Sequence, residues 1–136
     1  MSIQLTKQKA IEEHRKMWNW IAEQYENGST EEAYMLKEQY CRDHGYFIIS
    51  NECFCCEYDN QVANNVCDGC KYCPLLWGTE SKTSDFFCEY KDTGLWTRMW
   101  QLTRYGSTIL EHIEAAKIAR QIANLPERPD KQGDIL

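Results

Sequence analysis

The sequence lacks an excess of positive charge. It has 15 Lys and Arg residues against 21 Asp and Glu residues, which gives a net charge of -6 and a pI near 5.1. Proteins that bind phosphate backbones broadly need clustered Lys and Arg, and usually a basic domain. The composition therefore argues against broad electrostatic binding to nucleic acid and leaves only a local basic patch open.

Long apolar runs and familiar catalytic motifs are also missing. The first residues, MSIQLTKQKAIEEH, become charged too early for a signal peptide or a membrane span. There is no Gly-rich phosphate loop, no HExxH motif and no GxSxG motif. We therefore expect a cytoplasmic protein that does not contact a membrane.

The chain contains enough apolar material for one core. Its 136 residues are 43% hydrophobic and 12% aromatic, which is typical of a globular protein of one domain. We predict a mainly α fold with a small β component, in which a helical hairpin and C-terminal helices surround an irregular zinc-binding insert. The expected single domain covers 1–125: the hairpin is 4–45, the zinc-binding segment 46–91, the C-terminal helices 92–125, and a flexible tail follows at 126–136.

Apolar spacing of three and four residues predicts the individual helices. The first should run over 6–26 and stop at Asn27-Gly28; the second should begin with a cap at Ser29 or Thr30 and end at His44-Gly45. A short strand is expected over 46–49. Two further helices are expected over 94–104 and from 107 or 108 to 125. The buried stripe of the last helix should comprise Ile109, Ile113, Ala116, Ile122 and Ala123, and the Trp96/Trp100 helix should pack on the first helix.

The eight cysteines carry the chemistry. Cys53 and Cys56 form one C-x2-C pair and Cys70 and Cys73 form another, with thirteen residues between them. A tight turn between two cysteines lets both sulfurs converge on one ion, and two such turns make a tetrahedral four-thiolate zinc site. A reducing cytosol favours metal binding over disulfides. The spacing therefore predicts one structural Zn2+ that orders residues 50–91.

The remaining cysteines leave the exact ligand set open. Cys67 begins a second C-x2-C turn with Cys70, so it is an alternate ligand, and Cys88 is the other alternate. A second zinc that uses Cys67 and Cys88 also stays open. Cys55 is adjacent to Cys56, which has the better spacing. Cys41 is interpreted as a small buried hydrophobe.

Other chemistries fit the cysteines less well. An iron-sulfur cluster would need a fourth cysteine shortly after Cys73 and before a proline, but Pro74 follows directly. A redox C-x-x-C needs a βαβ context that is absent here, and a complete four-thiolate set leaves no position for a substrate. His14, His44 and His112 are expected at surfaces or helix ends, and the pairs Glu12-Glu13 and Glu31-Glu32 in first turns or on solvated faces.

Several segments resemble a family of small cysteine-rich proteins encoded by tailed bacteriophages. They are HRKMWNWIA (14–22), CFCCEYD (53–59), CKYCPLLW (70–77), Cys88, GLWTRMW (94–100) and AKIARQIANLP (116–126). In that family the two pairs matching Cys53/Cys56 and Cys70/Cys73 are the recognisable core, and Cys88 matches as well. The resemblance implies an accessory phage product in the cytoplasm of an infected bacterium.

The leading functional hypothesis is non-catalytic. We expect a zinc-binding protein that binds and modulates a host or phage protein, through the apolar surface of the first helix or the acidic face of the second. A zinc-finger-like nucleic-acid binder is the alternative, motivated by Lys71, Lys82, Lys91, Arg98 and Arg104. A metal-dependent or thiol-dependent enzyme is the third reading, and it requires an open coordination position or a reactive thiol.

Overall fold

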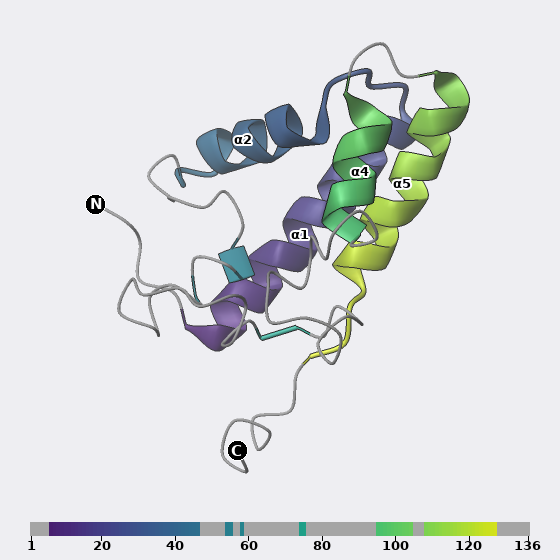
Figure 1. The fold of residues 1–136 in the computed structure, drawn as a ribbon. Helices are drawn as coiled ribbons and strands as arrows, with labels where there is room; N and C mark the ends of the chain where they lie inside the picture. The colour runs from purple at the N-terminus through teal and green to yellow at the C-terminus, as the bar shows by residue number, and fades with distance from the viewer. Residues whose placement is uncertain are drawn as a thin grey trace.

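The fold is known from a computed structural model, which describes residues 6–46, 54, 55, 58, 74, 75, 95–104 and 108–127. The described part is helical, as the sequence predicts: α1 spans Lys7–Glu26, α2 Ala33–Asp43, α4 Leu95–Thr103 and α5 Ile109–Ala123. Figure 1 shows α4 and α5 side by side, α1 running behind them and α2 crossing one end. Residues 47–49 of the strand predicted over 46–49, and most of the cysteine segment, lie outside the described residues.

Helix α1 begins and ends where its sequence requires. The Thr6 side chain accepts a hydrogen bond of 3.1 Å from the Lys9 backbone N–H, which satisfies one of the unpaired donors of the first turn. At the other end Asn27 is the C-cap and Gly28 has a φ of 95°, a conformation that favours glycine. The whole predicted apolar stripe is buried: Ala10, Ile11, Trp18, Ile21, Ala22 and Tyr25.

Helix α2 starts later than the sequence predicts. Its N-cap is Glu32, whose side chain forms no capping bond, so the predicted cap at Ser29 or Thr30 is wrong. The Ala33 backbone N–H instead donates to Thr103 Oγ1 of α4, at 3.0 Å. A hydroxyl seventy residues away thus caps α2. Local sequence patterns cannot predict such a cap. The predicted end at His44-Gly45 is confirmed, and Gly45 has a φ of 79°.

The pairing of α1 with α5 is the largest helix contact among the described residues. Small side chains at the interface let the helices approach closely, because alanine adds little width. The buried alanines of the two helices are Ala10 and Ala22 on α1 and Ala115, Ala116 and Ala119 on α5. The pairing also contains a buried hydrogen bond, in which His14 Nε2 donates to the Ile122 carbonyl at 3.0 Å.

The outward face of α5 corrects the predicted stripe. Thr108 and Glu111 form a full capping box at its start, as expected for a helix beginning after Thr108. Ala116, Ile122 and Ala123 are buried as predicted, but Ile109 and Ile113 are 79% and 47% exposed. The buried face of α5 consists instead of His112, Ala115, Ala116, Ile118, Ala119, Ile122 and Ala123, so the helix is rotated relative to the orientation that Ile109 and Ile113 suggest.

Helix α4 packs on α5 and on α2, and its Thr103 side chain also interacts with the Tyr25 hydroxyl of α1. The Trp96 side chain lies outside the described part of the structure, so its expected packing on the first helix stays a prediction. Met99 and Thr103 are its buried side chains, and Thr103 Oγ1 donates to the Met99 carbonyl at 3.0 Å while it caps α2. Trp100 is only half-buried and has the Arg104 guanidinium 4.1 Å above its ring. Helix α4 therefore joins the start of α2 to the side of α5.

Candidate functional site

The six predicted zinc ligands and alternates lie outside the described residues. These are Cys53, Cys56, Cys70, Cys73, Cys67 and Cys88. Among the described residues, no group of three or more His, Cys, Asp or Glu side chains is arranged to hold a metal ion. The zinc assignment therefore stays a prediction, and the structure contributes the residues that flank the two cysteine pairs.

The first pair brackets two residues of the hydrophobic core. Phe54 and Cys55 occupy a helical position between Cys53 and Cys56, and both are fully buried. The Phe54 ring meets the Tyr46 ring edge-on with centroids 5.0 Å apart, and the Tyr40 ring at 6.2 Å. The chain between the two predicted ligands is therefore fixed to the end of α2.

The second pair is followed directly by another core contact. Pro74 is buried, and Leu75 is fully buried and forms an isolated antiparallel bridge with Glu127. Arg15 holds the same C-terminal segment to α1, because its guanidinium donates to the Leu125 carbonyl at 3.2 Å and pairs with the Glu127 carboxylate at 3.5 Å. Glu127, which the sequence analysis assigns to the flexible tail, is thus part of this contact.

Phe54, Cys55 and Leu75 belong to the same hydrophobic core. Each predicted C-x2-C turn is therefore attached to one common body at a position no more than two residues from a ligand. This arrangement suits a four-thiolate zinc site, since the metal would then need to order only the chain between two fixed points. Such a site supplies structural stability and leaves no coordination position for a substrate.

The two described cysteines lie in the core. Cys41 is 4% exposed on α2, which confirms its interpretation as a small buried hydrophobe. Cys55 is 0% exposed beside Phe54, so its side chain is packed among apolar groups. Cys56 lies outside the described residues, so the preference for Cys56 over Cys55 as a ligand stays a prediction.

Two of the three histidines are buried, contrary to expectation. His14 is fully buried in the α1 and α5 pair, and His112 is 7% exposed with its ring stacked on Tyr25 at 5.7 Å. Only His44 has the predicted helix-end position, and its Nδ1 lies 2.9 Å from the Tyr40 carbonyl. Histidine occurs both in cores and at surfaces, so the hydropathy pattern does not distinguish a buried histidine from an exposed one.

Glu13 is also buried, which corrects its expected place on a solvated face. The side chain is 4% exposed, and Tyr40 donates its hydroxyl to Oε1 at 3.3 Å. Lys9 and Lys16 pair with Oε2 at 3.4 and 3.5 Å. The Glu13 charge raises the pKa of Lys9. Because the carboxylate is fully engaged within the fold, it serves the α1 and α2 contact and not a catalytic dyad.

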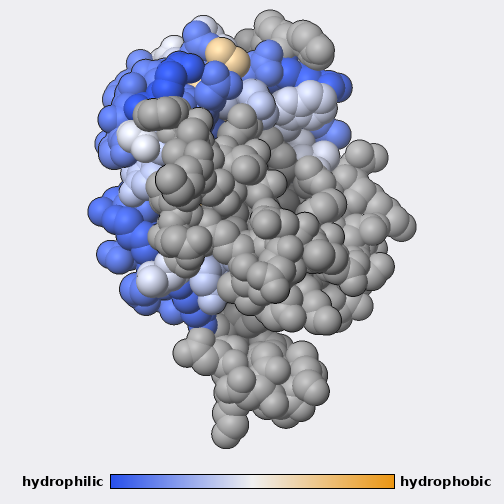
Figure 2. Space-filling model, turned by 90° about the vertical axis from the view of Figure 1, so that its left-hand side faces the viewer, coloured by the Kyte–Doolittle hydropathy of each residue, from blue (hydrophilic) through white to orange (hydrophobic). Residues whose placement is uncertain are grey.

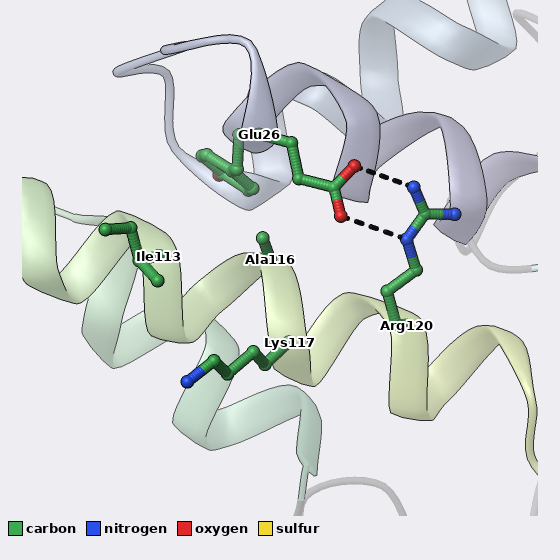
Figure 3. A pocket seen from close by; sticks show the side chains of 6 residues that line it. Glu26, Ile113, Ala116, Lys117 and Arg120 are labelled. Carbon is green, nitrogen blue, oxygen red and sulfur yellow. Dashed lines mark hydrogen bonds and ion pairs between the residues drawn. The ribbon is translucent and has the colours of Figure 1, made fainter.

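A groove lies between the end of α1 and the middle of α5 (Figure 3). Its volume is about 500 Å³, and the residues that line it are Tyr25, Glu26, Ile113, Ala116, Lys117 and Arg120. Arg120 lies at one end of the groove, where it forms bidentate hydrogen bonds of 2.7 and 3.2 Å with the Glu26 carboxylate and donates a hydrogen bond of 2.9 Å to Asn19 Oδ1. Hydrogen bonding to Arg120 lowers the pKa of Glu26. Lys117 points away from this pair.

Exposed apolar side chains continue the groove towards the start of α5. Ile109 and Leu110 are 79% and 78% exposed, and Ile113 forms part of the groove wall. We call Ile109, Leu110 and Ile113 the α5 apolar patch. Seen from the side away from α5, the described surface is mostly hydrophilic (Figure 2). The apolar face of α1, which the sequence analysis offers as a contact surface, is instead buried under α5 and α2.

Comparison with known proteins gives no relative. No family model, no curated protein and no solved structure matches the chain. Within the described residues, none of the helices has the length and apolar character needed to cross a bilayer.

Proposed function

We propose that this protein is a zinc-stabilised, non-catalytic binding protein that attaches to another protein. Its setting would be the cytoplasm of an infected bacterium, where it would act as a phage accessory product on a host or phage protein. The zinc would be held by Cys53, Cys56, Cys70 and Cys73, and its chemical contribution would be structural.

The observation that carries the binding role is the α5 apolar patch. Ile109 and Leu110 each have more than three quarters of their surface exposed. Burying such a side chain is favourable by roughly 1.5 to 3 kcal/mol relative to leaving it in water, and the isolated chain does not gain this energy. In a chain of net charge -6, an apolar patch next to a groove is typical of a surface that another protein covers.

The nucleic-acid alternative receives less support from the described basic residues. Arg98 lies 3.9 Å from the Glu114 carboxylate, so part of its charge is compensated within the fold. Arg104 stacks on Trp100. A groove that tracks a phosphate backbone needs several cations directed outward together, and these two are directed at neighbouring side chains.

Affinity capture with a charged variant tests the binding role. The double variant Ile109→Glu/Leu110→Glu should fold, because both positions are exposed. As a control, Gln8→Glu/Gln39→Glu adds the same charge at exposed polar positions. Zinc-loaded wild type and control should retain a stoichiometric partner from bacterial lysate, and the Ile109/Leu110 variant should lose it. A capture that ignores this variant, or a salt-sensitive gel shift with DNA without any captured protein, would contradict the proposal.

A further inference from the structure

We infer that the groove between α1 and α5 is a docking site for an amphipathic helix of the partner, with a carboxylate that pairs with Lys117. This inference rests on the proposed binding role and adds the surface and the chemistry of the ligand. The groove and the α5 apolar patch form one surface, because Ile113 belongs to both.

The dimensions of the surface suit a helix. From Ile109 to Arg120 the outward face of α5 extends for about 16 Å, at 1.5 Å per residue, which is about three helical turns. Ile109, Ile113 and Lys117 are exposed and follow one another at four-residue spacing, so they form one continuous stripe along this face of α5. Helices that dock in such grooves use apolar side chains at i, i+3 or i+4, and i+7, which match a surface of this length.

The charges of the groove select an acidic ligand. Arg120 is already engaged by Glu26 and Asn19. Lys117 is exposed, and in the part of the chain that the structure describes it forms no ion pair with a carboxylate. Its ammonium group is directed away from Glu26 (Figure 3). An acidic side chain on the docked helix would supply the missing counter-charge, which favours correct partners and orientation.

A second copy of this chain fits the surface less well. Two α5 helices paired about a twofold axis through Ile113 would place each Lys117 opposite Ile109 of the copy. Both ammonium groups would then lie against an aliphatic side chain and lack a carboxylate. A net charge of -6 on each chain opposes the same association at low salt.

The test is a display selection on the full, zinc-loaded chain. The probe is a library of helical peptides with randomised residues on one face, and each enriched peptide is then titrated by fluorescence anisotropy. We expect enrichment of apolar residues at helical spacing together with Asp or Glu. Ile113→Ser should weaken binding about tenfold, the equivalent of one lost apolar contact. Lys117→Glu should weaken it about fivefold, and Arg42→Glu, an equal charge change on α2, should leave it unchanged.

A charge exchange completes the experiment. Replacing the acidic peptide residue with Lys should restore binding to Lys117→Glu and weaken binding to the wild type. Enriched peptides that are basic, or that ignore both Ile113 and Lys117, would overturn the inference, as would the recovery of no binder. A dimer in sedimentation that Ile113→Ser dissociates would replace the proposed ligand with a second copy. A partner captured through Ile109 and Leu110 but insensitive to Lys117 and Ile113 would overturn the docking site and leave the proposed function intact.

Discussion

Leu75, two residues after the second cysteine pair, forms a β-bridge with Glu127, the last residue that the structure describes. Leu75 is fully buried, and Arg15 of α1 pairs with the Glu127 carboxylate. The predicted zinc segment is thus joined to the helical body through both α1 and the residues after α5. Zinc binding and helix packing should consequently be coupled.

Truncating the core contact beside the first pair should weaken both stability and zinc retention. Phe54→Ala removes a fully buried ring that packs on Tyr40 and Tyr46, at a cost of about 3 to 5 kcal/mol. Chemical denaturation measures this loss, and a chromogenic chelator should take zinc from the variant faster than from the wild type. Met35→Ala, at an exposed position of α2, is the control. A destabilised variant that releases zinc at the wild-type rate would show that core packing and zinc retention are uncoupled.

The cap that α4 provides to α2 makes a second prediction. Thr103→Val removes the hydroxyl that accepts from the buried Ala33 N–H, which leaves a donor unsatisfied at a cost of about 1 to 3 kcal/mol. Thr30→Val makes the same chemical change at an exposed position, one of the two that the sequence offers as the cap. Urea denaturation should show a clear loss for Thr103→Val and a much smaller one for Thr30→Val; the reverse order would refute the long-range cap.

Thr30 and Thr103 illustrate which features the sequence predicts: those set by neighbouring residues, and not those set by the packing of distant helices. The bounds of α1, the capping box of α5 and the C-terminal end of α2 follow from residues within a few positions of each other, such as Thr6, Thr108 and Gly45. The Thr103 cap does not, because it depends on how α4 packs. The burial of Glu13, His14 and His112 depends on packing in the same way, since partners from another helix satisfy or cover each side chain.

The exposure of the α5 apolar patch also depends on packing. Large aliphatic residues dominate a hydropathy pattern, so the sequence predicts Ile109 and Ile113 inside, whereas the buried face of α5 combines Ile118 and Ile122 with alanines. The exposed isoleucines then mark the candidate binding surface. For the zinc site, the sequence predicts the ligands from the spacing of the cysteines. It does not predict that Phe54 and Leu75, next to the two cysteine pairs, are packed in the hydrophobic core.

The ion pair at the end of the groove should contribute to stability in a pH-dependent way. Bonding to Arg120 lowers the pKa of Glu26 from 4.5, so the contribution is present above that pH and is lost as the pH falls through the lower folded value. In urea denaturation over an acid series, Glu26→Gln should therefore lose less stability than the wild type. Glu31→Gln, at an exposed position, is the control. Parallel curves for Glu26→Gln and wild type would count against the pair.

Tyr25 should make the protein sensitive to alkali. Burial raises the pKa of its hydroxyl above 10.0, and the hydroxyl donates to the Glu31 carbonyl at 2.7 Å. The stabilisation is present below the unfolded pKa and is lost as the pH rises towards the folded one. Tyr25→Phe should cost about 1 kcal/mol at neutral pH and should lose less stability than the wild type in alkali. Ultraviolet titration and denaturation together check this, and an early-ionising Tyr25 would contradict it.

Native mass spectrometry of the purified chain tests the central claim most directly. The wild type should carry one zinc ion. Cys56→Ser and Cys70→Ser should lose it, whereas Cys55→Ala and Cys41→Ala should keep it, because neither Cys55 nor Cys41 belongs to the two C-x2-C pairs that predict the site. A wild-type chain without metal, or zinc that survives in Cys56→Ser and disappears in Cys55→Ala, would contradict the account.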